Sequence, residues 1–147
     1  MTLEALAQAV EQAVPLVVTH FVPDRLDYLA AGGRVSNPAA LGAALLKIKP
    51  RIDILDGKLI AGKKYRGTMA KVVPKLLEDF LAKDLDKRQG YVFYAAGCDL
   101  AVVEGAARRM KEAGFLQVDV FQIGCVMSIH GGPGAIGITA RRKTAED

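Results

Sequence analysis

Two glycine-rich segments contain the residues best suited to bind a ligand. One is Gly32-Gly33-Arg34-Val35-Ser36, and the other begins at His130 and continues through Gly131 and Gly132 to Gly137. Consecutive glycines let main-chain N–H groups face one way and let a ligand approach closely, while Arg34 or His130 supplies a charge or a donor. This combination favours a carboxylate or a phosphate. Two structural roles stay open: Arg34 in a surface ion pair at a helix end, and His130 as a hydrogen-bonded structural histidine.

Two enzymatic interpretations of the second segment fail on their context. Residues 132–137 match the G-x-G-x-x-G pattern of dinucleotide-binding proteins, but that fingerprint opens a helix and has an acidic residue about 20 positions on. Only ten residues follow Gly137, and they resemble a strand and a charged tail. A catalytic pair of Cys125 and His130 rests on proximity in sequence alone, with no third residue to orient the base. We therefore expect no enzymatic activity, no cofactor and no metal site.

The composition predicts one folded domain. Of the 147 residues, 51% are hydrophobic and 24% are charged, which provides enough apolar surface for a core. Cys98 and Cys125 form no C-x-x-C pair, so we expect two reduced core thiols rather than a disulfide or a zinc site. No signal-peptide pattern opens the chain, and every apolar run is well short of about 18 residues, so we expect a soluble, cytoplasmic protein.

The net charge of +4 is unevenly distributed. Between residues 47 and 66, the acidic residues are Asp53 and Asp56, and the cations are Lys47, Lys49, Arg51, Lys58, Lys63, Lys64 and Arg66. Such a basic face can attract nucleic acid, an anionic headgroup or an acidic protein. A nucleic-acid- or anion-binding domain is therefore an alternative function. Nucleic acid is the weaker candidate, because Tyr65 is the one aromatic residue in this stretch and no known reader motif occurs. An ordinary solvated hairpin surface also stays open.

Hydrophobic periodicity predicts a two-layer α/β domain with a mixed sheet of five or six strands. Helices are expected after residues that can cap them, namely Thr2, Asp24, Asn37, Thr68 and Asp99. Pro15 should end the first helix. Pro74 should kink the helix after Thr68 or shorten its first turn.

Strands are expected at 16–22, 91–96, 116–121 and 135–140, with a β-hairpin at 50–64 that turns at Asp56-Gly57. The strands at 91–96 and 116–121 flank a helix, so they should be parallel neighbours joined by a right-handed crossover. A glycine-rich loop is expected at 131–134. The two glycine-rich loops should lie at one rim of the sheet, so Arg34 and His130 should converge although 96 positions separate them.

The motifs around these segments resemble the DegV family. They occur in the family's order: Leu26-Asp27-Tyr28-Leu29, Gly32-Gly33-Arg34-Val35-Ser36, Ile48-Lys49-Pro50, the Asp56-Gly57 hairpin, Arg66-Gly67 before a long helix, Ile123-Gly124-Cys125-Val126, and His130-Gly131-Gly132-Pro133-Gly134-Ala135-Ile136-Gly137. The resemblance covers roughly residues 16–140. The chain departs from the family at Gly131, where threonine is common, so one hydroxyl group that could contact a ligand is missing.

The resemblance implies a bacterial fatty-acid-binding protein in which two α/β domains enclose one acyl chain. Such a carrier presents the acyl carboxylate to a separate fatty acid kinase, which makes an acyl phosphate for phospholipid synthesis. Residues 1–147 would be the carboxy-terminal lipid-binding domain, with the amino-terminal domain of the family absent. Arg34 and His130, with Gly131 and Gly132, would lie near the carboxylate or phosphate. Without the second domain, we expect weak fatty acid binding and a homodimer formed through exposed apolar surface.

Overall fold

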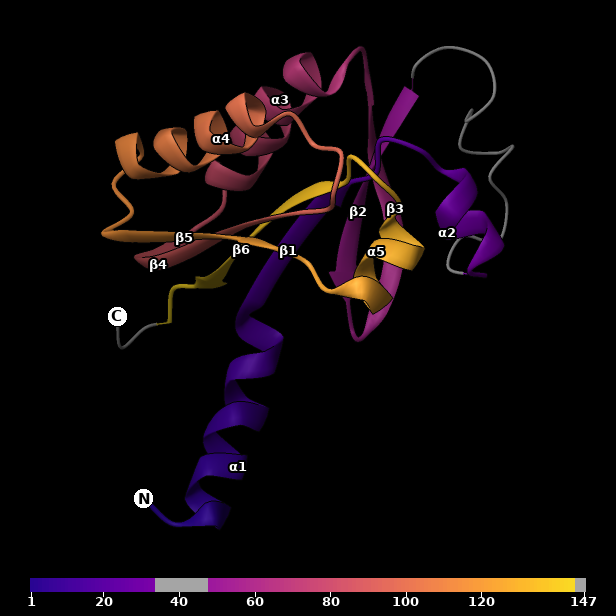
Figure 1. Ribbon diagram of the computed structural model, residues 1–147. Coiled ribbons are helices and arrows are strands. Elements are labelled where there is room, and N and C mark those ends of the chain that lie inside the picture. The colour runs from indigo at the N-terminus through magenta and orange to yellow at the C-terminus, as the bar shows by residue number, and fades with distance from the viewer. Residues whose placement is uncertain (34–47, 145–147) are drawn as a thin grey trace.

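Figure 1 shows the computed structural model, which describes residues 1–33 and 48–144. The helices are α1 (Leu3–Ala13), α2 (Asp27–Ala31), α3 (Met69–Leu81), α4 (Leu100–Glu112) and α5 (Cys125–Gly131), with a 3₁₀ turn at Val14–Leu16. The strands are β1 (Val17–Val22), β2 (Ile48–Leu55), β3 (Lys58–Arg66), β4 (Leu85–Tyr94), β5 (Gln117–Gln122) and β6 (Ile136–Arg142). They form one six-stranded sheet in the order β3-β2-β1-β6-β4-β5, which confirms the predicted α/β class.

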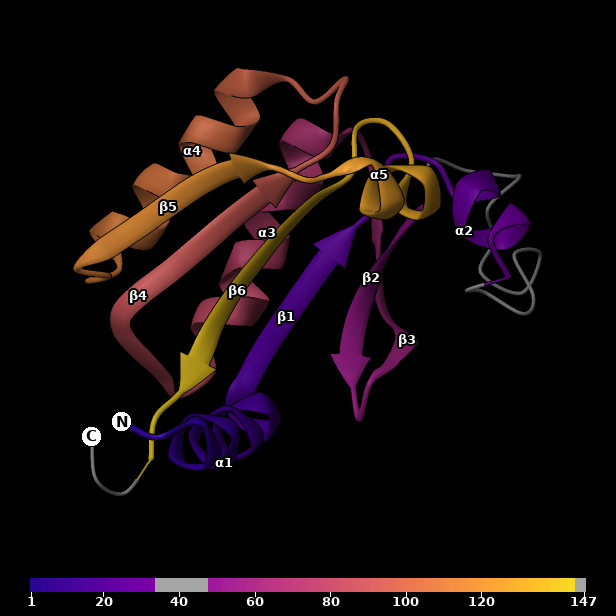
Figure 2. The same cartoon turned by 60° about the horizontal axis from the view of Figure 1, so that its bottom comes forward.

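The strand directions follow the sequence prediction. β4 and β5 are parallel neighbours joined through α4, while the other strand pairs in the described sheet are antiparallel. The β2–β3 hairpin turns at Asp56 and Gly57, whose φ angles of 49° and 71° are those of a tight primed turn. β1 and β2 pair at two positions only, His20 with Asp53 and Phe21 with Ile52. Figure 2 shows these two strands diverging away from that contact.

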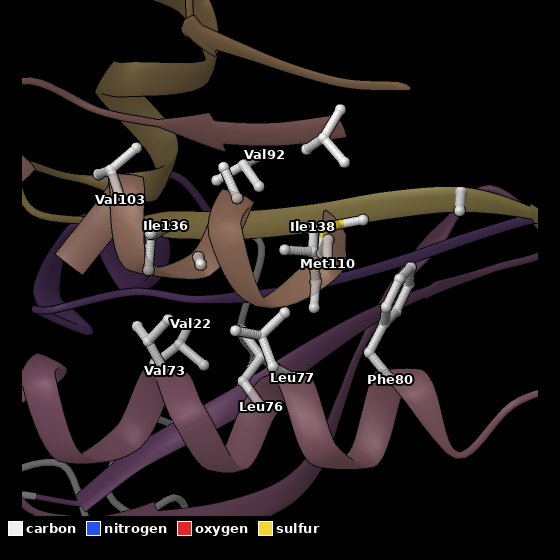
Figure 3. Packing of buried hydrophobic residues seen from close by; sticks show 14 of the residues in the cluster. Val22, Val73, Leu76, Leu77, Phe80, Val92, Val103, Met110, Ile136 and Ile138 are labelled. Atoms are coloured by element: carbon white, nitrogen blue, oxygen red, sulfur yellow. The ribbon is translucent and has the colours of Figure 1, made fainter. Parts of the chain in front are cut away.

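The main core lies between the sheet and the helices α3 and α4, which cover the same face (Figure 1). Five residues of α3 are buried at helical spacing: Val72, Val73, Leu76, Leu77 and Phe80. They pack with Val22, Val92 and Ile138 of the sheet and with Val103 and Met110 of α4 (Figure 3). Of the two predicted effects of Pro74, the structure excludes a shortened first turn, and a kink stays a prediction. α3 continues through Pro74 to Leu81, because buried side chains on both sides of the proline hold the helix in place.

The predicted helix caps had mixed outcomes. The side chain of Thr2 accepts a hydrogen bond from Ala5 N–H at 3.2 Å, and that of Asp99 accepts one from Ala101 N–H at 2.9 Å, as expected for caps of α1 and α4. Asp24, however, does not cap α2, which begins at Asp27 without a side-chain cap. Its carboxylate instead accepts a hydrogen bond from Lys49 Nζ at 2.6 Å. The helix predicted after Asn37 lies outside the described residues.

Two surface features complete the fold. α1 extends away from the sheet (Figure 1), and its apolar residues Leu3, Leu6 and Val10 are exposed. None of the described helices is long and apolar enough to cross a membrane. The prediction of two core thiols was wrong, since Cys98 is half-buried and Cys125 is exposed. Cys125 is exposed because it begins α5, a surface helix that the sequence analysis did not predict.

Candidate functional site

His130 lies in the last turn of α5, where that helix faces the end of α2. The contact depends on a glycine, because a Cβ atom at Gly32 would stand 2.3 Å from His130 Nδ1. That nitrogen is buried and has no hydrogen-bond partner within 1–33 and 48–144. The His130 ring is thus packed between the last turn of α5 and the end of α2.

The loop after α5 packs against α2 and the segment that joins α2 to β1. Gly132 has a φ of 77°, and a Cβ there would lie 2.8 Å from Tyr28 Cδ2. Gly134 has a φ of 78°, and a Cβ there would lie 2.8 Å from Asp24 Cβ. Both positions therefore need glycine for conformation and for space. The two glycine-rich segments of the sequence thus meet in space through Gly32 and His130.

Arg34 lies outside the described residues, so its approach to His130 stays a prediction. The other predicted site residues, His130, Gly131 and Gly132, are consecutive in the chain, so their proximity does not test the predicted site. Gly131 ends α5 and is buried, and Gly132 continues directly into the loop beside Tyr28. His130, Gly131 and Gly132 therefore form one continuous stretch at the rim of the sheet.

An apolar pocket of about 310 Å³, here called the α5 pocket, opens beside His130. Phe21 and Phe93 line its sheet side, since they alternate along their strands with Val22 and Val92, which point to α3 and α4. The remaining lining residues come from α2, the β2–β3 hairpin, α5 and the segments beside it: Leu29, Ile54, Gly57, Leu59, Ile123, Val126, Met127, His130, Gly131, Ala135 and Ile136. The pocket thus lies between α5 and the face of the sheet opposite α3 and α4.

The chemistry of the α5 pocket is one-sided. Among its described lining residues, His130 is the only one with a polar side chain. The apolar walls extend from this histidine to Ile54 and Leu59 of the hairpin. An amphiphile with a headgroup at His130 and a hydrocarbon tail toward the hairpin fits this distribution, because burying apolar surface is favourable and a buried polar group needs a partner.

A second recess of about 430 Å³ lies on the other side of the 131–134 loop and shares Ile136 with the α5 pocket. Two of its lining residues carry groups that could be reactive, and both groups already make interactions within the chain. Lys49 binds Asp24, and the thiol of Cys98 donates to the Ala135 carbonyl at 3.2 Å. Burial raises the pKa of the Cys98 thiol, which disfavours the nucleophilic thiolate. In the part of the chain that the structure describes, no group of three His, Cys, Asp or Glu side chains is placed to hold a metal ion.

The basic stretch at 47–66 is partly neutralised by carboxylates. Lys49 pairs with Asp24 at 2.6 Å, Arg51 with Asp53 at 2.8 Å and Lys63 with Asp79 at 2.7 Å. Asp24 and Asp79 lie outside the stretch in sequence, so the excess of positive charge there overstated the charge of this face. This pairing weakens the case for binding nucleic acid through it, although that alternative stays a prediction.

The sequence of this chain matches a known protein family over nearly its whole length. A sequence model described as an uncharacterised protein of the DegV family matches residues 1–143. This chain belongs to the DegV family. A DegV domain-containing protein of Deinococcus radiodurans is 31% identical over 139 residues, which cover 90% of this chain and 47% of the relative. One from Clostridium acetobutylicum is 34% identical over 143 residues, covering 93% of this chain and 48% of the relative. The chain thus spans about half the length of these curated relatives.

Solved DegV structures share the fold. A DegV family protein from Eubacterium eligens loaded with heptadecanoic acid superposes with a TM-score of 0.83 at 23% identity, over 97% of this chain and 51% of that one. The fatty acid kinase (Fak) B3 protein of Streptococcus pneumoniae, loaded with linoleic acid, gives 0.83 at 17% identity, over 97% and 50% of the two chains. At this identity the similarity establishes the DegV fold.

The sequence of this DegV chain points to His130 but not to the pocket beside it. The helical spacing of Val126, Met127 and His130 was a usable signal for α5. It was missed because the helix has only seven residues and stands between glycines. Phe21 and Phe93 gave no such signal, since nothing in their local sequence shows that the register of β1, β6 and β4 brings them to one pocket.

Proposed function

We propose that this chain is the carboxy-terminal, acyl-binding domain of a DegV-type fatty acid carrier. One observation carries the proposal: the side chains that line the described α5 pocket are apolar except for His130. The two solved relatives described above were loaded with heptadecanoic acid and linoleic acid, which are amphiphiles of this kind.

In this proposal the hydrocarbon tail lies between α5 and the sheet, over Phe21 and Phe93. Each buried CH₂ group stabilises the complex by about 0.8 kcal/mol where the surroundings exclude water. The carboxylate lies at the rim, where His130 can donate a hydrogen bond and the Gly131–Gly132 backbone allows close approach. Arg34 is proposed to supply a positive charge at the same rim.

The proposed carrier performs no reaction itself. We assign phosphorylation of the carboxylate to a separate fatty acid kinase, which would approach the rim that bears His130. The kinase named with the Streptococcus pneumoniae relative supports this partner. A second α/β domain would supply the other wall of the acyl site, which fits a chain that spans about half of its relatives.

A photoreactive palmitate with a diazirine near its methyl end tests the binding proposal, since covalent capture detects even weak occupancy. Peptides containing Met127, Phe93 or Ile54 should be labelled, and unlabelled palmitate should compete. Met127→Trp should fill the pocket and reduce labelling. Ile129→Trp is the matched control on the same helix, because Ile129 is 65% exposed and does not line the pocket. Labelling that is spread over α1, or that palmitate does not reduce, would contradict the proposal.

A further inference from the structure

One row of register partners crosses the sheet on the side of the α5 pocket, and its middle position is a glycine. Ile52 pairs with Phe21, Phe21 with Gly137, Gly137 with Phe93, and Phe93 with Phe121. Residues that are directly opposite on adjacent strands place their side chains on the same face. Gly137 therefore leaves a gap in an otherwise apolar and mostly aromatic row.

Phe93 fills that gap. A Cβ atom at Gly137 would stand 2.2 Å from Phe93 Cζ and 2.4 Å from its Cε2, so the ring lies directly over the glycine. On its other side the Phe93 ring stacks against Phe121, with centroids 6.2 Å apart and planes inclined by 28°. The backbone conformation does not explain the glycine, because Gly137 is not among the described residues with positive φ. Space for the ring does explain it.

The distance between the Phe93 ring and the β6 backbone affects the width of the α5 pocket directly. Phe93 lines the sheet side of the pocket, and Val126 and Met127 of α5 line the helix side. Any side chain at position 137 would lift the ring away from β6 and toward α5. The same Cβ would lie 2.7 Å from Phe21 Cβ, an atom that the β1 backbone holds in place. The absence of a side chain at Gly137 therefore decides how closely the Phe93 ring approaches β6 at the floor of the pocket.

We propose that the contact between Phe93 and Gly137 sets the cross-section of the acyl pocket and selects straight hydrocarbon chains over branched ones. This inference rests on the proposed fatty acid binding. A straight chain can lie along the flat floor, whereas a methyl branch in the middle of the chain needs extra width where Phe93 faces α5. The selectivity comes from steric exclusion, since His130 carries the one polar side chain among the described lining residues and the others are apolar.

The experiment compares two competitors against the photoreactive palmitate. One is palmitate and the other is an isomer with a methyl branch in mid-chain. In the wild-type chain, palmitate should compete better. Phe93→Leu should shrink the difference between the two competitors by about fourfold, the factor that corresponds to about 0.8 kcal/mol for one buried carbon. Tyr91→Leu is the matched control, because Tyr91 lies two residues before Phe93 on the same face of β4 and does not line the pocket.

Gly137→Ala tests the other half of the contact. This substitution should displace the Phe93 ring into the pocket and weaken competition by both fatty acids. In the double variant with Phe93→Leu, competition should be partly restored. Circular dichroism confirms that each variant is folded. If palmitate and its branched isomer compete for the Phe93→Leu variant in the same ratio as for the wild-type chain, and specific labelling persists, the selectivity inference is wrong. The binding proposal then stands. If palmitate fails to compete even in the wild-type chain, the binding proposal itself fails.

Discussion

The two faces of the sheet differ in composition and in how far helices cover them. On the α3 and α4 side, Val22, Val92 and Ile138 are fully buried. On the other side, Tyr91 is 36% exposed and Phe121 is 46% exposed, because α5 and α2 cover only part of the surface. An antiparallel sheet with one solvated face normally carries polar residues there. The row of Thr19, Thr139, Tyr91 and Asp119 is largely polar, as this rule expects, whereas the neighbouring row of Phe21, Phe93 and Phe121 is not. The aromatic row is therefore the part of the open face suited to contact with another molecule.

The covered face should contribute nearly all of the folding free energy. Removing one aromatic side chain from each face tests this prediction. Phe80→Ala empties a fully buried position in α3 and should reduce the free energy of unfolding by about 3 to 5 kcal/mol. Phe121→Ala on the open face should reduce it by about 1 kcal/mol or less. Urea denaturation of both variants measures the difference. Equal losses would show that the open face belongs to the folding core.

The open face should bind fatty acid only weakly by itself. With one wall of the site exposed to water, most of the gain from burying the hydrocarbon chain is lost, and a carboxylate contact at an exposed rim contributes only about 0 to 1 kcal/mol. We expect calorimetric titration of the 147-residue chain with oleate or palmitate, below micelle-forming concentrations, to show no tight isotherm. A stoichiometric isotherm in the micromolar range or tighter would show that this chain carries the complete acyl site.

The exposed apolar surface should also promote self-association. α1 adds Leu6 and Val10 to this surface, with exposures of 45% and 54%. Val10→Lys should weaken a dimer by about tenfold, since it removes roughly the burial of one valine. Gln8→Lys adds the same charge on the polar side of α1 and should have little effect. Sedimentation velocity over a range of concentrations measures both, and a monomeric wild-type chain would contradict the prediction.

The smallest expected effect concerns a buried histidine on the covered face. His20 contacts Asp53, and its ring packs edge-on against Phe80 at 5.7 Å between centroids. Burial lowers the pKa of His20, although Asp53 opposes this shift and Arg51 and Lys83 add to it. As the pH falls, His20 therefore binds a proton more readily in the unfolded chain than in the folded chain. Stability should be constant above about pH 6.5 and decrease as the pH falls below it.

His20→Gln should remove this part of the pH dependence. Urea denaturation between about pH 7 and pH 5 should show a smaller loss of stability in the variant than in the wild-type chain. Ionisation of Asp79 does not contribute to the pH dependence in this range. Burial works against ionisation of this carboxyl, but hydrogen bonds from Lys63 and Tyr65 hold its pKa below its usual range. Its contribution is therefore lost only at lower pH. Identical profiles for the two proteins would exclude His20 as the cause.

Local sequence predicted the elements that form local patterns. The apolar stripe of α3, the Asp56-Gly57 turn and the strand–helix–strand order of β4, α4 and β5 were each predicted correctly, because each depends on residues close together in the chain. The motif order also identified the family. Contacts between distant residues could not be predicted in this way. Lys49 with Asp24 and Lys63 with Asp79 are examples, and both changed the interpretation of the basic stretch.

The sequence by itself determined that the chain is a DegV domain, and it singled out His130 beside a run of glycines. Only the tertiary structure decided that a pocket lies beside it and what shapes that pocket. The register of the sheet places Phe21, Gly137 and Phe93 in one row. The physical reason is that a side chain's face follows from local alternation, whereas its neighbours depend on how strands far apart in sequence pair with one another.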